Sequence, residues 1–359
     1  MADSKQAPLD AAAAAKAAFA SVQDKPFPND IFTAPELRWA VIGCGVIANQ
    51  MAQSLALAGR KLVGVANRTL SKAQAFAEQY GIEKVYETVE DLYADPDIDA
   101  VYITTPHNTH ITYLRAALAA GKHVLCEKAI TLNSAELDEA RAVADEHNVV
   151  LMDATTVLHM PLYQELRRRM GAGEFGRMNL AQLNFGSYKE YGDLTNRFYN
   201  RNLAGGAMLD IGVYALSVMR LFMASQPFEV VSLGNTCETG VDVAGGIVCR
   251  NAEQQLGVVS LTLHSKQPKR SVISFDKCYI EVNEYPRADH ATIVWTADGH
   301  REEVHAGTEA YALCYEMADL EKAVAGDDSK RELLGYASDV MELMTKLRAD
   351  WGVVYPEEE

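Results

Sequence analysis

The sequence predicts an α/β protein of two domains, in which a doubly wound parallel sheet precedes an α+β domain with a large, mostly antiparallel open sheet. A chain of 359 residues exceeds one ordinary core, and 48% hydrophobic residues are ample for two. Apolar strand-like runs alternate with helical segments from residue 38 to about 155, and short runs of alternating polarity follow. We therefore expect an N-terminal extension at 1–37, a first domain at 38–157 and a second domain at 158–359.

The first domain repeats a unit of one strand and one helix. The strand candidates are continuous apolar runs, as buried parallel strands are, at 39–43, 61–67, 100–105, 123–127 and 149–154. Helical segments follow the first four of these runs, at 49–59, 71–81, 110–121 and 134–147. Parallel neighbours need such crossovers, so the pattern predicts a parallel sheet covered by helices on both faces.

The second domain has a different pattern. A helix is expected at 161–173, and strand candidates with alternating polarity follow at 178–188, 245–250, 256–264, 270–275 and 292–297. Turn-rich pieces such as "CRNAEQ" and "TADGH" indicate hairpins. Two helical stretches, 308–326 and 329–352, close the chain.

Composition favours small-molecule partners. Lysine and arginine total 33 against 49 aspartates and glutamates, without a basic stripe for nucleic acid or an anionic membrane. The six cysteines form no C-x-x-C pair, which argues against disulfides or structural zinc and favours a reducing cytoplasm, and no cluster has metal-ligand spacing. We read no secretory signal, and no apolar run that reaches the ~20 residues of a membrane span.

Residues 1–37 comprise an alanine-rich helical piece and a segment broken by prolines, "KPFPNDIFTAPE". One interpretation is a partly ordered tail. The alternative is an arm in which Phe19, Phe27 and Phe32 pack on a neighbouring subunit.

A glycine pattern lies between the first strand and the first helix. "WAVIGCGVIANQMA" contains G-x-G-x-x-A at Gly43, Gly45 and Ala48, where two glycines allow a tight turn and the approach of a pyrophosphate. The amides at the start of the helix, at Val46 and Ile47, then face that phosphate. In this strand, turn and helix context the pattern predicts dinucleotide binding rather than a purely structural turn.

The residues at the end of the second strand candidate indicate which dinucleotide the protein binds. An NAD site usually places an acid there for the ribose hydroxyls, but this chain has Asn67, Arg68 and Thr69. Arg68 can pair with a 2'-phosphate and stack on adenine, with Asn67 and Lys72 as further donors. We therefore expect NADP, with NAD possible; the competing interpretation is a solvated loop arginine.

Two further stretches contain groups suited to acid–base chemistry. Glu127 and Lys128 follow a strand whose carboxyl end lies beside the crevice where open α/β sheets bind ligands, so we expect both to contact the nicotinamide end of the cofactor. After the glycine pair 205–206, Asp210 and Tyr214 stand four apart and therefore on one helical face.

Five pieces carry a resemblance to a known family: "VIGCGVIA", "PDIDAVYITTPHNTH", "AGKHVLCEKAITLN", "LAGGAMLDIGVYAL" and "LRADWGVVYP". They cover nearly everything after residue 38, and the chain resembles the Gfo/Idh/MocA oxidoreductase family, in its dihydrodiol and sugar dehydrogenase-like branch. The resemblance implies a Rossmann domain, an open-sheet substrate domain, and oxidation of a secondary hydroxyl on a sugar, cyclitol or diol, or reduction of the ketone. It also implies a homodimer or a higher oligomer.

The resemblance implies catalytic roles for three residues. Lys128 matches the lysine of the family's E-K-P signature, and Asp210 and Tyr214 match its D-x-x-x-[H/Y] pair. Hydride loss from a carbinol carbon requires loss of the hydroxyl proton, so a proton acceptor must lie within about 3 Å of that oxygen. Tyr214 or Lys128 can carry this proton, and Asp210 would orient one of them or another substrate hydroxyl.

Other matches and departures concern the surrounding loops. Thr105, Pro106, Asn108 and His110 resemble the family's nicotinamide-side loop, although histidine in such a place is more often a loop or capping residue. The signature continues with proline, whereas this chain has Ala129, and Leu158 replaces a common arginine. Candidates for substrate contact, each of which has a structural alternative, are His159, Arg197 and Tyr199.

The sequence therefore predicts a cytoplasmic, NADP-preferring oxidoreductase that transfers a hydride at a secondary hydroxyl of a polyhydroxylated or cyclic diol substrate. One alternative is a redox-neutral enzyme that oxidises a sugar transiently to ease elimination or glycoside cleavage. The other is an NADP(H)-binding regulatory protein whose chemistry has lapsed, against which the joint presence of Lys128, Asp210 and Tyr214 speaks.

Overall fold

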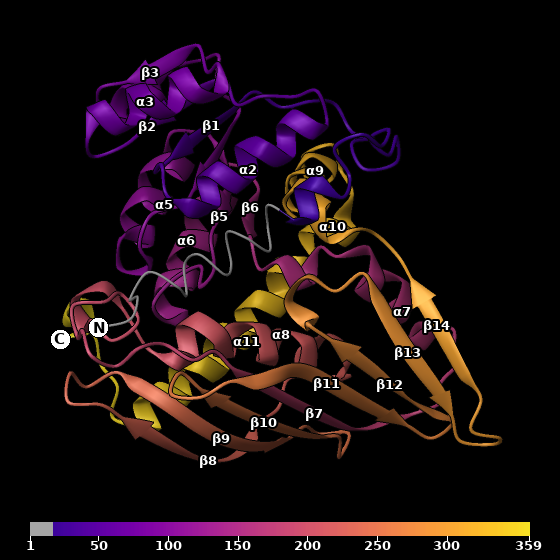
Figure 1. Cartoon of the computed structure of the whole chain (residues 1–359). Helices are drawn as coiled ribbons and strands as arrows, with labels where there is room; N and C mark the ends of the chain where they lie inside the picture. Colours follow the sequence, from indigo (N-terminus) through magenta and orange to yellow (C-terminus); the bar gives the residue numbers. More distant parts are fainter. Residues whose placement is uncertain (1–16) are drawn as a thin grey trace. The chain divides into compact units, whose positions relative to one another are not determined.

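Two units, each built on one sheet, make up residues 17–359, the part of the chain that the computed structural model describes (Figure 1). The first unit contains the chain up to Thr131 together with Ala135–Ala154 and Ala310–Leu334. The second unit contains Leu132–Ser134, Thr155–Glu309 and Gly335–Glu359. The predicted fold class, a doubly wound parallel sheet plus a large, mostly antiparallel sheet, is confirmed.

The sheet of the first unit has the order β3-β2-β1-β4-β5-β6, and all of its paired strands are parallel. Its strands are β1 (Trp39–Ile42), β2 (Gly64–Ala66), β3 (Lys84–Tyr86), β4 (Ala100–Ile103), β5 (His123–Cys126) and β6 (Leu151–Asp153). The crossovers contain α2 (Val46–Leu57), α3 (Leu70–Tyr80), α4 (Val89–Ala94), α5 (His110–Ala119) and α6 (Ser134–Glu146). The strand order reverses between β1 and β4, which makes their carboxyl ends the ligand-binding switch point of such a sheet.

Strand β3 and helix α4 are absent from the sequence-based prediction. Strand β3 has only three residues at the sheet edge, and of these only Tyr86 is buried. A strand this short and this exposed has no apolar run, so only its pairing with β2 reveals it.

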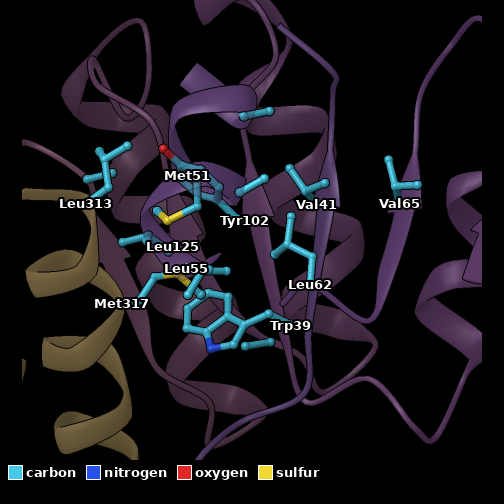
Figure 2. Packing of buried hydrophobic residues seen from close by; sticks show 14 of the residues in the cluster. Trp39, Val41, Met51, Leu55, Leu62, Val65, Tyr102, Leu125, Leu313 and Met317 are labelled. Atoms are coloured by element: carbon cyan, nitrogen blue, oxygen red, sulfur yellow. The ribbon is translucent and has the colours of Figure 1, made fainter. Parts of the chain in front are cut away.

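Helix α9 (Ala312–Val324) belongs to the first unit although it lies far along the chain. Its residues Leu313 and Met317 pack with Met51 and Leu55 of α2 and with Leu125 of β5 in one buried cluster (Figure 2). The unit boundaries therefore differ from the continuous second-domain range 158–359. The reason is that the apolar face of α9 is buried against the parallel sheet, which a local sequence pattern does not reveal.

A buried carboxylate attaches α9 to this sheet. Glu321 is inaccessible and accepts hydrogen bonds from both terminal nitrogens of Arg60, at 2.6 and 3.1 Å, and from the indole nitrogen of Trp39 at 3.0 Å. The backbone amide of Leu37 donates to the same carboxylate at 3.2 Å. Four donors compensate the cost of burying this charge.

The segment before β1 packs on its own chain. The ring of Phe27 stacks on Phe32 at 6.0 Å and meets Tyr311 edge-on at 5.0 Å, and the Arg60 guanidinium lies 4.0 Å above Phe32. Phe27 and Phe32 thus pack within the first unit, and an arm on a neighbouring subunit stays a prediction. The alanine-rich piece falls mainly on residues 1–16, outside the described residues.

The sheet of the second unit has the order β14-β13-β12-β11-β7-β10-β9-β8, and only its β7–β10 pair is parallel. The strands are β7 (Met178–Gly186), β8 (Glu229–Thr236), β9 (Asp242–Arg250), β10 (Leu256–Thr262), β11 (Gln267–Phe275), β12 (Cys278–Asn283), β13 (His290–Trp295) and β14 (Arg301–His305). The sequence analysis missed β8, β12 and β14. Strands β8 and β14 are the two sheet edges, and of their residues only Val304 is buried.

The remaining helices are α7 (Pro161–Gly171), α8 (Val213–Phe222), α10 (Asp328–Arg331) and α11 (Leu333–Asp350). A π-helical turn, Met208–Gly212, runs directly into α8, which packs on β7, β10 and β11. Single 3₁₀ turns occur at His107–Thr109, Thr156–Leu158, Arg201–Leu203, Tyr285–Arg287, Glu309–Tyr311 and Pro356–Glu358.

One helical stretch, Arg201–Phe222, is long and apolar enough to cross a membrane by length and composition. Of its most apolar window, 78% is buried inside the protein, as expected for a core helix. The sequence analysis read no apolar run of this length, because Asp210 and Arg220 interrupt the apolar residues of the stretch.

Candidate functional site

The glycine turn between β1 and α2 is confined by the neighbouring strand β4. Gly43 has φ +102°, and a Cβ on it would lie 2.6 Å from Thr104 Oγ1. The amide of Gly43 donates to Ala66 O at 2.9 Å, and the amide of Thr104 donates to Ile42 O at 2.9 Å. Only glycine fits at this position, at the point where the strand order reverses.

The second glycine of the turn faces open space. Gly45 is the N-cap residue of α2, a Cβ on it would meet nothing within 4 Å, and no side chain caps this helix end. The first amides of a helix have no intrahelical acceptor, and here the neighbouring Val46 is 65% exposed. An open, uncapped helix start behind a glycine turn fits the pyrophosphate of a dinucleotide.

Lys72 lies close enough to the glycine turn to influence the pKa of Cys44, the residue between the two glycines. Burial raises the pKa of the Cys44 thiol to about 11, and the positive charge of Lys72 opposes that shift. Lys72 is exposed on α3, as is Arg68 at the end of β2. The side chain of Asn67 donates to Thr69 O at 2.9 Å and shapes the loop that carries Arg68.

The loop after β4 is fixed by His110, which is completely buried. Its Nε2 lies 2.8 Å from Thr105 O, and its Nδ1 lies 3.0 Å from Ala129 O. Burial lowers its pKa, and the nearby charge of Lys128 acts in the same direction. We therefore replace the expected cofactor contact of His110 by a positioning role, in which the imidazole joins the loops that follow β4 and β5.

Other residues of the nicotinamide-side loop are accessible. Pro106 is exposed, and Thr105 and Asn108 are partly exposed. Thr109 Oγ1 donates to Pro106 O at 2.7 Å and lies 2.8 Å from Thr105 Oγ1. This part of the predicted site is thus a short structured turn on the carboxyl side of β4.

Glu127 and Lys128 follow β5, the strand next to β4 in the sheet. The hydroxyl of the buried Tyr102 donates to the Glu127 carboxylate, whose second oxygen accepts from the Lys128 amide at 3.3 Å. The Lys128–Ala129 peptide bond is cis. Lys128 therefore stands at the same carboxyl edge of the sheet as the glycine turn, as expected from its place after a buried strand.

In the second unit, the catalytic candidates follow the turn Gly205–Gly206. Asp210 lies in the π-helical turn and is buried, whereas Tyr214 lies one turn later in α8 and is partly exposed. The ring of Tyr214 is tilted against Phe185 of β7 at 6.1 Å. Both side chains belong to one continuous helical segment, Met208–Phe222.

Arg197 contacts this segment from the preceding loop. A terminal nitrogen of Arg197 lies 3.3 Å from Asp210 Oδ1, and the guanidinium lies 4.2 Å from the Phe198 ring centroid. The ammonium of Lys189 lies 4.1 Å from the same ring centroid. The Arg197 side chain is still 58% exposed, so it can bind a ligand while it pairs with Asp210.

Two other substrate candidates are buried within the second unit. Tyr199 is inaccessible and its hydroxyl donates to Lys189 O at 2.8 Å, which supports the loop 189–199. His159 is also inaccessible. We therefore do not carry these two residues forward as direct substrate contacts.

The sequence reasoning missed Thr104 and Tyr102. Thr104 confines Gly43, and Tyr102 holds Glu127 in front of Lys128. Both are ordinary strand residues in the sequence. Only the adjacency of β1, β4 and β5 gives them a role.

Comparisons with known proteins agree with this architecture. Residues 37–155 match the model described as "Oxidoreductase family, NAD-binding Rossmann fold", and residues 163–281 match the model of the GFO/IDH/MocA C-terminal domain. The chain is 32% identical over 254 residues to trans-1,2-dihydrobenzene-1,2-diol dehydrogenase of Mus musculus, covering 69% of this chain and 75% of that protein. The pig protein of the same name, from Sus scrofa, is 28% identical over 90% of this chain and 99% of its own.

Solved structures show the same fold. A 3-ketoreductase from Actinomadura kijaniata in complex with NADP and TDP-benzene superposes with a TM-score of 0.75 at 24% identity, over 88% of this chain and 98% of that one. Levoglucosan dehydrogenase in complex with NADH and levoglucosan superposes with a TM-score of 0.76 at 20% identity, over 87% and 97%. At these identities the likeness concerns the fold.

The open glycine allows a direct test of the cofactor site. A methyl at Gly45 meets no protein atom, so Gly45→Ala should fold normally. The methyl would project toward the pyrophosphate, and we expect the Kd for NADPH to rise at least ~10-fold by calorimetry. Gly171→Ala in α7, whose added methyl also meets nothing, is the matched control. Equal affinities in the two variants would contradict this placement of the pyrophosphate.

Proposed function

This chain belongs to the Gfo/Idh/MocA family of NAD(P)-dependent oxidoreductases, and we propose that it transfers a hydride between a nicotinamide and a secondary hydroxyl, or ketone, of a sugar, cyclitol or cyclic diol. One observation carries this proposal. The glycine turn after β1, the loop after β4 and Lys128 after β5 all stand at the carboxyl edge of three neighbouring strands. An ammonium at that edge is suited to act on an oxygen of the substrate.

The proposed roles divide between the two units. A bound nicotinamide would supply the site at C4 that accepts or donates the hydride. Tyr214 Oη or Lys128 Nζ takes the proton from the substrate hydroxyl, and returns it in the reverse direction. Asp210, paired with Arg197, orients a substrate hydroxyl or one of the two proton carriers. The Tyr102 and His110 side chains hold the loop of Lys128 and so support its orientation.

The substrate class rests on the relatives and on the chemistry of the site. The relatives include proteins named as a dihydrodiol dehydrogenase, a 3-ketoreductase and a levoglucosan dehydrogenase. A carboxylate, a guanidinium and a phenol on the second unit offer several hydrogen bonds to vicinal hydroxyls. These features support a polyhydroxylated or cyclic diol substrate.

We expect reduction of NADP or NAD when the protein is incubated with a panel of sugars, inositols and cyclic diols. Absorbance of the reduced nicotinamide should rise in proportion to product. Tyr214→Phe and Lys128→Ala should each lower kcat by about 100-fold or more, because the proton acceptor or the neighbouring charge is lost. Tyr279→Phe, at an exposed position of β12, is the control and should retain full activity.

The outcomes separate the competing functions. Substrate conversion without net absorbance change would favour the redox-neutral alternative. Tight NADPH binding without turnover of any substrate would favour a regulatory protein. Near-normal kcat in either variant would remove the role of that residue.

We propose NADP as the preferred cofactor, because the exposed Arg68 stands where an NAD site has an acid. The nearby positive charge of Lys72 supports this preference. Arg68→Ala should reduce the ratio of kcat/KM for NADP to that for NAD by about 10-fold or more, since a charge-assisted contact with the 2'-phosphate is lost. Arg141→Ala in α6 is the control. An unchanged ratio would discard the assignment.

We also propose that the protein forms a dimer through the open face of the second sheet. Val231 and Leu233 of β8 are 76% and 84% exposed, and Val231 is in register with Val248 of β9, which in turn is in register with Val258 of β10. The opposite face of β8 and β9 is covered, because Trp351 lies against Gly234 and Gly245. An exposed apolar row across three strands is typical of an interface.

Leu233→Glu should convert the dimer to a monomer in sedimentation velocity, because a charge would be buried without a partner at the interface. Ala75→Glu, on an exposed position of α3, is the control. A monomeric wild-type protein, or an unchanged mass of the Leu233 variant, would rule out this interface.

The free thiols support a cytoplasmic location. All six cysteines are unpaired, four of them buried. Thiols persist in a reducing compartment. Fractionation that finds the protein in an oxidising compartment would contradict this location.

A further inference from the structure

The glycine pair before the catalytic helix is held in a very narrow space. A Cβ on Gly205 would lie 2.6 Å from Arg197 O, and a Cβ on Gly206, whose φ is +124°, would lie 2.3 Å from Asp242 Oδ1. The amide of Gly206 donates to Phe198 O at 2.9 Å. Any shift of this turn therefore moves the start of the helical segment Met208–Phe222.

Asp242 caps this helical segment from another strand. It is the first residue of β9, is fully buried, and its Oδ2 accepts the Met208 amide at 2.6 Å. The first amides of a helix lack intrahelical acceptors, and a carboxylate near them also complements the helix dipole. The residue at the N-cap position, Ala207, has no side chain that could accept a hydrogen bond. Asp242 therefore serves as the N-cap acceptor.

Tyr355 holds the same glycine turn through the carbonyl oxygen of Gly205. Its buried hydroxyl donates to Gly205 O at 2.7 Å. The Arg348 guanidinium lies 4.6 Å from the Tyr355 ring centroid and pairs with Glu358 at 2.8 and 2.9 Å. Glu358 in turn accepts the Tyr355 amide at 3.0 Å. We refer to Arg348, Tyr355 and Glu358 as the Arg348 cluster.

The Arg348 cluster also holds the chain that follows Lys128. A terminal nitrogen of Arg348 donates to Leu132 O at 2.5 Å, and Asn133 Nδ2 donates to Glu358 at 2.9 Å. Leu132 and Asn133 lie four and five residues after Lys128 in the sequence. One buried cluster thus fixes both the turn before Asp210 and the connection after the lysine.

We propose that Asp242 and Tyr355 are positioning residues, which fix the Gly205–Met208 turn and thereby set the places of Asp210 and Tyr214. The Arg348 cluster extends the same restraint to the segment Leu132–Asn133. This inference rests on the proposed function for its effect on turnover, whereas the restraint of the turn is independent of it.

The buried carboxyl group of Asp242 makes the stability of the protein depend on pH. Burial raises the pKa of Asp242 to about 6, while the Met208 amide and the charge of Arg348 act in the opposite direction. The other titratable groups nearby are Tyr355, whose pKa burial raises, and Glu358, which pairs with Arg348. Because the folded-state pKa exceeds the ordinary value of ~3.9, the contribution of Asp242 to stability falls as pH rises from about 4 to about 6. In the folded protein the charged cap forms as the pH rises through about 6.

Hydrogen exchange measures the restraint without relying on activity. Tyr355→Phe and Asp242→Ala should each speed exchange of the amides in 205–210 about 10-fold, the equivalent of one lost buried hydrogen bond. Tyr163→Phe is the matched control, because Tyr163 is also buried and its hydroxyl donates to Tyr285 O at 2.7 Å. The control variant should lose about as much thermal stability as Tyr355→Phe does. Its amides in 205–210 should not exchange faster than those of the wild type.

Turnover tests the consequence for the site. Tyr355→Phe should lower kcat about 10-fold with the KM for NADP unchanged, whereas Tyr163→Phe should leave kcat within about 2-fold of wild type. Asp242→Asn keeps an acceptor for the Met208 amide, so it should restore slow exchange and most of kcat. It should also remove the pH dependence of the protection factors at 205–210 near pH 6.

The two proposals fail in different ways. Equal exchange at 205–210 in the Tyr355 and Tyr163 variants overturns the positioning role, whatever the activity. Equal kcat values in those two variants, in an active wild-type enzyme, also overturn it. Faster exchange in Tyr355→Phe with a wild-type protein that turns over no substrate supports the restraint and contradicts the proposed function.

Discussion

The contact between Gly43 and Thr104 is the constraint on which the first unit depends. Strands β1 and β4 are neighbours at the point where the sheet order reverses, and a single added carbon on Gly43 would come 2.6 Å from the threonine hydroxyl. Helix α2 begins directly after this tight turn, no side chain caps it, and a Cβ on its N-cap residue Gly45 would meet only open space. The proposed place of a dinucleotide depends on this one close approach.

A glycine turn has a comparable function in the second unit. Gly205 and Gly206 leave no room for a side chain, since backbone oxygens and Asp242 surround them. Asp210 and Tyr214 follow on one continuous helical segment, so their places depend on the start of that segment. In both units a backbone position that excludes side chains determines where the candidate site residues lie, which is more precise than placement on a flexible loop.

Buried polar side chains complete the restraint of the loops. His110 joins Thr105 O to Ala129 O, Tyr102 holds Glu127, and Arg348 donates to Leu132 O. Each of these groups satisfies backbone or carboxylate oxygens that would otherwise be buried at a cost. Their common effect is to define the path of the chain on both sides of Lys128.

The sequence by itself determined the fold class, the glycine turn and the places of Lys128, Asp210 and Tyr214 along the chain, because these depend on local periodicity and on short motifs. The short or edge strands β3, β8 and β14 could not be predicted from the sequence, because their pairing partners rather than their composition define them. Only the tertiary structure decided that α9 completes the first unit, that His110, His159 and Tyr199 are buried, and that Asp242 and Tyr355 meet the Gly205–Gly206 turn. Those features arise from contacts between separate segments of the chain, such as Met208 with Asp242 and Gly205 with Tyr355, and a local pattern carries no information about such contacts.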